Sequence, residues 1–171
     1  DLVAAQADDI FERVTQFRGW TVDDVLIHLH FWNVGADLAV RDGAAFQALC
    51  ARMEAAVESK QRLAPLERAY FDGLRGRPLL GAWRRQVVEM TERIALVDPK
   101  RRVPWAGPPM SVRSSISARL METWLHGHDV TDALALPRRD TDRIRHILVI
   151  GVRTRAFSYT LRGLAPPAAP V

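Results

Sequence analysis

Residues 121–132, which read METWLHGHDVTD, place two histidines and three acidic residues within twelve positions. If this stretch is helical, at about 100° per residue, Glu122, His126 and Asp129 lie along one stripe of the helix. Glu122 and His126 then stand one turn apart, with Cβ atoms roughly 5–6 Å from each other. A carboxylate and an imidazole at this spacing can bind one cation, so the stretch predicts half of a metal site.

A further ligand has to come from another segment, and the sequence offers two H-x-H pairs, His28 with His30 and His126 with His128. On β-strands the members of such a pair point to one face, and four histidines could form a centre. In a helix the two members are about 200° apart and cannot share an ion. Helical periodicity favours the second alternative. It places His28 at the edge of an apolar face and His30 farther round toward solvent, so we expect His28, Glu122 and His126 to converge.

Structural alternatives to each of these roles stay open. His28 could bond a backbone carbonyl at the edge of the core, while Glu122 and His126 could form a surface pair. Asp129 could orient the ring of His126 through a hydrogen bond, or it could be an ordinary surface aspartate. Arg119, one turn before Glu122, could meet an anionic substrate or pair with Glu122. Arg119 and Asp129 are therefore candidate catalytic residues, in addition to the candidate metal ligands.

The rest of the chain predicts the helices that must position these residues. Thr21 followed by Asp24 is a variant of the capping box, and Ser111 is a plausible N-cap for the helix that carries Glu122. The stretch 103–110, VPWAGPPM, contains three prolines and a glycine and must be a shaped loop. Helices are expected at residues 2–17, 21–42, 46–59, from 65 to about 73, 79–98, 111–135 and 140–163. No strand pattern competes, so an all-α antiparallel helical bundle follows.

The composition fits one compact domain and excludes several classes of protein. With 171 residues, 48% of them hydrophobic and 26% charged, the chain can bury a sizeable core. The net charge of +4 raises nucleic acid as a partner, but the arginines are dispersed and there are no zinc-finger cysteines, so no nucleic-acid binding is expected. No apolar run reaches the roughly 20 residues of a membrane span, and no signal pattern opens the chain. A cytoplasmic location without a membrane partner is expected.

Two stretches of the chain resemble a known family. Residues 19–29, GWTVDDVLIHL, and residues 119–130, RLMETWLHGHDV, are similar to the metal-binding helical domain of the mycothiol-dependent maleylpyruvate isomerase family, within the DinB-like superfamily. Residues 103–110 and 143–154 resemble a branch of that family known only as metal-binding. The resemblance covers nearly the whole chain and implies a DinB-like four-helix bundle with an additional short helix and long loops.

The resemblance also implies a chemistry. A divalent ion, usually zinc, would be held by His28, Glu122 and His126, with a position left for water or for a small thiol such as mycothiol. The thiolate would attack a small electrophile. An isomerase would add the thiolate to a conjugated double bond, allow rotation and eliminate it, whereas an S-transferase would keep the adduct. The alternatives are a non-catalytic metal-binding or ligand-sensing module and a metal-free helical interaction domain.

The same resemblance sets the expected domain organisation. Residues 1–163 are expected to form the metal-binding bundle, and residues 164–171, LAPPAAPV, a proline-rich linker to a second domain that this chain lacks. An exposed apolar helix face could support a homodimer.

Overall fold

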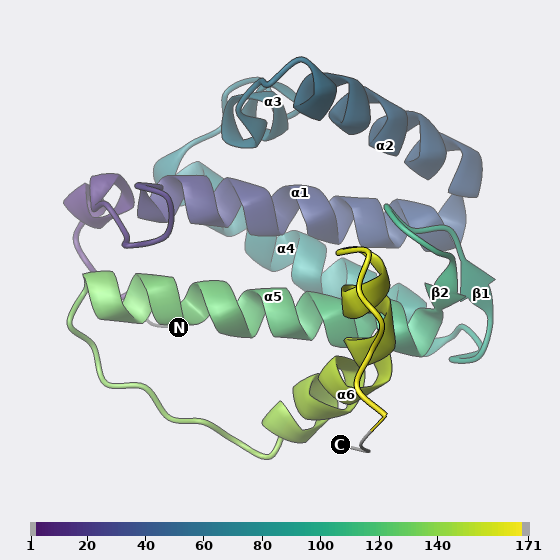
Figure 1. The fold of residues 1–171 in the computed structure, drawn as a ribbon. Helices are drawn as coiled ribbons and strands as arrows, with labels where there is room; N and C mark the ends of the chain where they lie inside the picture. The colour runs from purple at the N-terminus through teal and green to yellow at the C-terminus, as the bar shows by residue number, and fades with distance from the viewer. Residues whose placement is uncertain (1–2, 169–171) are drawn as a thin grey trace. The chain divides into compact units, whose positions relative to one another are not determined.

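The computed structural model describes residues 3–168, which are mostly helical (Figure 1). The helices within that range are the 3-10 helix η1 (Asp8–Glu12) and the α-helices α1 (Val22–Arg41), α2 (Gly43–Glu58), α3 (Leu63–Ala69), α4 (Gly76–Ala95), α5 (Val112–Ala133) and α6 (Ile144–Thr160). The short strands β1 (Arg102–Val103) and β2 (Met110–Ser111) pair antiparallel. The predicted all-α helical bundle is confirmed. The last three residues of the predicted linker, 169–171, lie outside the described residues.

The chain divides into two compact units, residues 1–138 and residues 139–171. The second unit contains α6, and the first contains the bundle and every candidate site residue. No described helix combines the length and the apolar character needed to cross a membrane.

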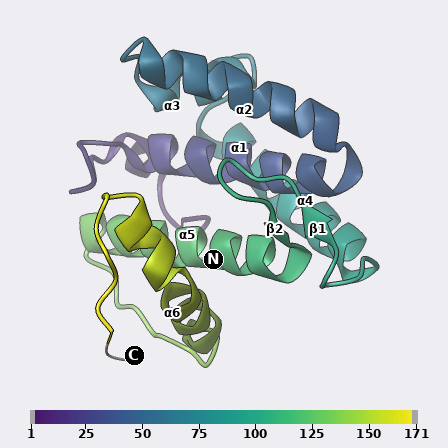
Figure 2. The same cartoon turned by 45° about the vertical axis from the view of Figure 1, so that its right-hand side comes forward.

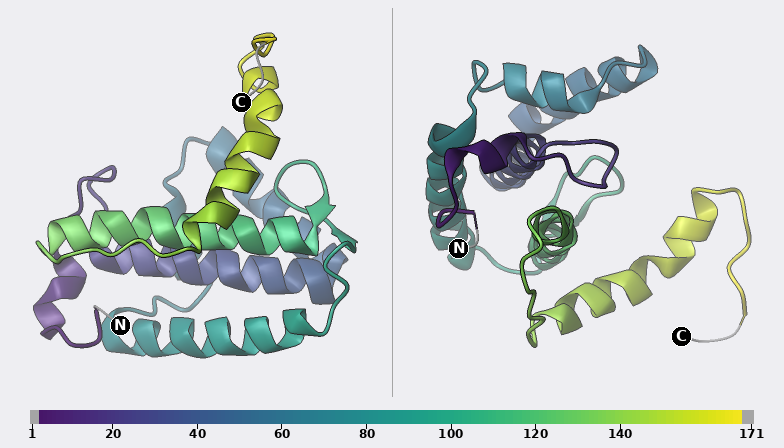
Figure 3. Two further views of the ribbon diagram at one scale, coloured as in Figure 1. Left: turned by 90° about the horizontal axis from the view of Figure 1, so that it is seen from below. Right: turned by 90° about the vertical axis from the view of Figure 1, so that its left-hand side faces the viewer.

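Helix α1 is the central element of the first unit. It contacts α2, α3, α4 and α5, and it lies between the α2–α3 pair and α5 in Figures 1 and 2. Consecutive long helices α1, α2, α4 and α5 alternate in direction (Figure 1). In Figure 3, α1 and α5 lie side by side in the view from below and in the view along their axes. This contact brings the two segments that carry the candidate ligands together.

Local hydrogen bonds set the start of both ligand-bearing helices. Thr21 Oγ1 accepts from the Asp24 amide at 3.1 Å, and Asp24 Oδ2 accepts from the Thr21 amide at 3.1 Å, so the predicted capping box is confirmed. Ser111 Oγ accepts from the Ser114 amide at 3.2 Å and caps α5, as predicted. Because these caps satisfy amides that the first turn leaves free, they fix where each helix begins.

An ion-pair network ties α3 and α4 to the start of α1. Arg68 of α3 donates to Asp23 at 2.6 Å and to Asp24 at 2.7 Å. The other oxygen of Asp23 accepts from the Gly76 amide, the first residue of α4, at 2.7 Å. The apolar core beside this network consists of Ile10, Phe11, Val22, Val25, Leu26, Ile27, Leu29, Leu79, Leu80 and Val130. The network holds α3 beside the first turn of α1, about one helical turn before His28.

The predicted helix over residues 2–17 is wrong. Only η1 is helical there, and residue 2 lies outside the described part of the chain. The segment that follows folds back on itself: the Thr15 amide donates to the Trp20 carbonyl at 2.7 Å, and the Val22 amide donates to the Arg13 carbonyl at 3.0 Å. Gly19 turns the chain at a φ of +69°, a conformation that glycine adopts without strain. Hydrogen bonds across this loop replace the expected helical ones.

Other predicted boundaries differ less. α3 begins at Leu63 rather than at Pro65, and the loop 103–110 is closed at its base by β1 and β2. The predicted Asp140–Thr141 cap of the last helix is wrong, because α6 begins at Ile144 without a capping side chain.

Candidate metal centre

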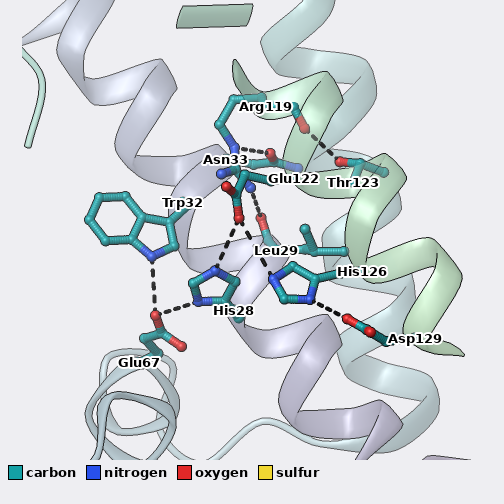
Figure 4. A network of polar contacts seen from close by, with 10 residues as sticks. All are labelled: His28, Leu29, Trp32, Asn33, Glu67, Arg119, Glu122, Thr123, His126 and Asp129. Carbon is teal, nitrogen blue, oxygen red and sulfur yellow. Dashed lines mark hydrogen bonds and ion pairs between the residues drawn. The ribbon is translucent and has the colours of Figure 1, made fainter. Parts of the chain in front are cut away.

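The predicted ligands His28, Glu122 and His126 converge between α1 and α5 (Figure 4). His28 Nε2 lies 3.7 Å from Glu122 Oε2, and His126 Nε2 lies 3.6 Å from the same oxygen. One ligand atom from each residue lies within 4.8 Å of the other two. The two residues of the E-x-x-x-H spacing meet because they are one helical turn apart, and His28 joins them because α1 packs on α5.

These separations fit a small divalent cation. With bonds of about 2.1 Å, neighbouring ligand atoms of a tetrahedral zinc ion are roughly 3.4 Å apart. The two separations to the Glu122 oxygen exceed this value by only a few tenths of an ångström. Two imidazoles and one carboxylate are also ligand types that zinc accepts, and such sets leave a fourth position open.

The outer nitrogen of each ring is held by a carboxylate. His28 Nδ1 is 2.8 Å from Glu67 Oε1, and His126 Nδ1 is 2.9 Å from Asp129 Oδ2. A carboxylate oxygen is a hydrogen-bond acceptor, so these contacts favour a proton on each Nδ1. In the neutral ring, the lone pair then lies on Nε2, which faces Glu122. Metal-binding histidines in proteins show this same arrangement.

The pKa shifts at the site reflect the carboxylates beside the rings. Burial by itself would lower the pKa of His28, but the neighbouring carboxylates of Glu122 and Glu67 outweigh burial and raise that pKa above its ordinary value. The neighbouring His28 ring lowers the pKa of Glu122, against the opposing effect of burial. Glu122 is therefore ionised at neutral pH, as a metal ligand must be.

Glu67 is a residue of the site that the sequence did not reveal. Its side chain is 0% exposed, and its Oε1 accepts from Trp32 Nε1 at 3.1 Å as well as contacting His28. It lies on α3, a helix of seven residues. So short a helix has too few apolar positions to show which face is buried, and the neighbouring Arg68 makes the segment look solvent-facing. No signal in the sequence distinguishes Glu67 from a surface glutamate.

Arg119 lies one turn before Glu122, as predicted, but it is buried. The residue is 5% exposed, and its guanidinium donates to Asn33 Oδ1 at 3.1 Å and to the Leu29 carbonyl at 3.4 Å. Within residues 3–168 it forms no ion pair, so the alternative pairing with Glu122 is absent. Burial lowers the pKa of Arg119 to about 10, against the opposing charges of Glu122 and Glu67. The group is thus a cation beside the candidate ligands at neutral pH.

Aromatic rings from the loop before α1 cover the site. The Trp20 ring stacks on His126 with centroids 6.0 Å apart and meets His28 edge-on at 5.2 Å. Phe17 contacts His126 edge-on at 5.0 Å. The sequence prediction missed both residues because it placed Phe17 on a helix and Trp20 at a helix break. The loop that replaced this helix turns both rings onto the histidines.

His30 is not directed toward solvent as predicted. It is buried and stacks on Phe71 with ring centroids 4.3 Å apart. Among the described residues its Nδ1 has no hydrogen-bond partner. Burial, followed by the charge of Arg85, lowers the pKa of His30 to about 4. The prediction failed because α1 is covered by helices on several sides, so a position off its main apolar face is also buried.

Comparisons with known proteins show similarity over the part of the chain that contains the whole candidate site. The sequence model of one family, described as the mycothiol maleylpyruvate isomerase N-terminal domain, matches residues 1–131. Two Mycobacterium tuberculosis proteins, named Uncharacterized protein MT0041 (strain CDC 1551 / Oshkosh) and Uncharacterized protein Rv0036c (strain ATCC 25618 / H37Rv), are each 37% identical to this chain over 169 residues. The match covers 99% of this chain and 65% of each relative, so the chain spans about two thirds of their length. No solved structure matches.

Proposed function

The chain belongs to the mycothiol maleylpyruvate isomerase N-terminal domain family, and from this premise we propose that His28, Glu122 and His126 bind a divalent ion, most suitably zinc. We propose further that the site acts with a small thiol, such as mycothiol, on a small electrophile, as an isomerase or an S-transferase. One observation is the main support for the metal proposal. Nε2 of His28 and Nε2 of His126 face the same oxygen of Glu122, while Nδ1 of each ring contacts a carboxylate.

The charges around the site support a divalent ion. Three carboxylates, Glu67, Glu122 and Asp129, contact the two rings, whereas Arg119 is the cation buried beside them. A cation held by the three ligands would be attracted by these carboxylates, and Arg119 would offset part of that attraction.

The residues around the ligands have distinct roles in this proposal. A bound divalent ion favours the thiolate form of a coordinated thiol, which is the form that attacks electrophiles. Asp129 orients the His126 ring through its 2.9 Å contact. Phe17 and Trp20 shield that ring from water. Arg119 attracts an anionic group of the thiol or of the electrophile toward the site.

Elemental analysis of protein purified without a polyhistidine tag tests the metal proposal. Wild type should contain, or take up, close to one equivalent of zinc, and His126→Ala should lose it. His128→Ala is the matched control, because His128 lies two positions along the same helix, packs on Trp124 and is not among the described residues whose ligand atoms converge. This control should keep its zinc. Well-folded wild type that binds no metal after incubation with zinc would contradict the proposal.

A thiol titration separates the enzyme from a non-catalytic metal-binding module. Zinc-loaded wild type should bind mycothiol or a simpler thiol with calorimetrically measurable heat, and the metal-free protein should not. Zinc binding without any thiol affinity would favour the ligand-sensing or structural alternative.

A further inference from the structure

We infer that Glu67 is a positioning residue that holds the His28 ring with its proton on Nδ1 and the lone pair of Nε2 directed at Glu122. This inference rests on the proposed function, in which the lone pair of His28 Nε2 binds the metal ion. It concerns a residue that is not itself among the ligands.

The contacts of Glu67 favour one tautomer of the His28 ring. Oε1 is 2.8 Å from His28 Nδ1 and accepts a second hydrogen bond from Trp32 Nε1 at 3.1 Å (Figure 4). Oε1 already accepts from Trp32 Nε1, and a carboxylate oxygen in that role is best matched by a proton on Nδ1. Water cannot substitute for Glu67, since its side chain is 0% exposed.

The fold places Glu67 rigidly. Its neighbour Arg68 is bound to Asp23 and Asp24, which lie in the first turn of α1. α3 is therefore fastened to the same helix that carries His28, and little movement between Glu67 and the ring is possible. An anchored carboxylate sets the orientation of a ring better than one on a mobile segment.

The other oxygen of Glu67 indicates that the residue is not there for stability alone. Oε2 is buried, and no described residue donates a hydrogen bond to it. A buried acceptor without a partner lowers the stability of the fold. A carboxylate kept at this position despite that loss is explained by what its other oxygen does to His28.

Asp129 makes the corresponding contact with His126 but is less confined. Its side chain is 25% exposed, and it lies on the same helix as the ring it contacts. Water can therefore replace it in part. We expect substitution of Glu67 to affect the site more than substitution of Asp129.

The variant Glu67→Gln tests the inference with little change of shape. A glutamine is a neutral and therefore weaker acceptor, and its amide group can also donate to Nδ1, so the preference for a proton on Nδ1 decreases. Zinc affinity, measured by competition with a chromogenic chelator, should fall by about 10- to 100-fold, the usual effect of removing such a partner. Asp129→Asn should lower the affinity by a smaller factor.

Trp32→Phe is the matched control for general disruption. It removes the second hydrogen bond to the same Oε1 and leaves the contact with His28 in place. Its melting temperature should fall, while its zinc affinity should stay within about threefold of wild type. If Glu67→Gln binds zinc like wild type, or if Trp32→Phe weakens binding as much as Glu67→Gln, the positioning role is wrong.

Nitrogen-15 NMR of the metal-free protein gives a readout that does not depend on zinc. At alkaline pH, where the ring is neutral, His28 should carry its proton on Nδ1 in wild type and populate both tautomers in Glu67→Gln. A wild-type ring protonated on Nε2 would overturn the inference. If wild type binds no zinc but His28 carries its proton on Nδ1, the proposed function is wrong, whereas the role of Glu67 in fixing the tautomer of His28 is supported.

Discussion

Asp37 of α1 and Arg93 of α4 form an ion pair with two hydrogen bonds, from Nε to Oδ1 at 3.0 Å and from Nη2 to Oδ2 at 2.8 Å. The Asp37 side chain is 1% exposed and also accepts from Arg41 at 3.0 Å. This pair holds the later part of α1 against α4, whereas the Arg68 network holds its first turn.

Asp37→Asn should therefore destabilise the bundle. The substitution removes the charge that both arginines contact, and buried charge-assisted hydrogen bonds of this kind contribute about 2–3 kcal/mol. Urea denaturation should show a loss of about that size. Glu89→Gln is the control, because Glu89 contacts the same Arg93 at 3.7 Å but is 55% exposed, and a change below about 0.5 kcal/mol is expected. Equal effects of the two variants would contradict this assignment.

The Asp37–Arg93 ion pair also predicts how the stability of the fold changes with pH. Burial would raise the pKa of Asp37, but hydrogen bonds and charge from Arg93 and Arg41 outweigh it and hold the pKa below the ordinary value of 3.8. The stabilisation is thus present above the unfolded-state pKa and is lost as the pH falls through the lower folded-state pKa. The difference in unfolding free energy between wild type and Asp37→Asn should be constant above about pH 5 and shrink in acid. A difference that grows on acidification would show that the pair is not ionised.

The buried His30 should cause a second change of stability with pH, at a higher pH than Asp37. Its pKa is about 4 in the fold against an ordinary 6.5, so the unfolded state binds the proton more readily between these values. Stability should fall as the pH drops from about 6.5 to 4, by about 2–3 kcal/mol for this one group. In His30→Phe, which keeps a ring against Phe71, that part of the fall should disappear. The unfolding free energies of wild type and His30→Phe should be measured by urea denaturation across this pH range, with a chelator present. If the two free energies change with pH in parallel, the prediction is wrong.

Arg119→Met should change cation and anion binding in opposite directions. The guanidinium repels a cation at the neighbouring ligands, so its removal should raise zinc affinity by about three- to tenfold. The same removal should weaken anionic ligands. In zinc-loaded protein, the preference for mercaptoacetate, which carries a carboxylate, over 2-mercaptoethanol should decrease. A variant whose preference between these thiols equals that of wild type would exclude Arg119 from anion binding.

The helices that carry the candidate ligands could be predicted from the sequence because their signals are local. The side chains of Thr21 and Ser111 bond amides a few positions ahead, so each cap marks a helix start without reference to the rest of the fold. The spacing of Glu122 and His126 needs only the pitch of one helix. Helical phase also selected His28 from its pair. Family resemblance added the nature of the expected ion and thiol, and the family itself is confirmed.

The tertiary structure alone decided the surroundings of those ligands. Glu67 reaches His28 because Arg68 fastens α3 to α1, a contact between residues distant in sequence. His30 is buried because α1 has helices on several sides, and the phase of one helix cannot report how many neighbours will cover it. The loop that brings Trp20 to the rings depends on backbone pairing that leaves no pattern in the side chains. Spacing along the chain thus determined which groups can share an ion, and packing between helices determined which groups hold them in place.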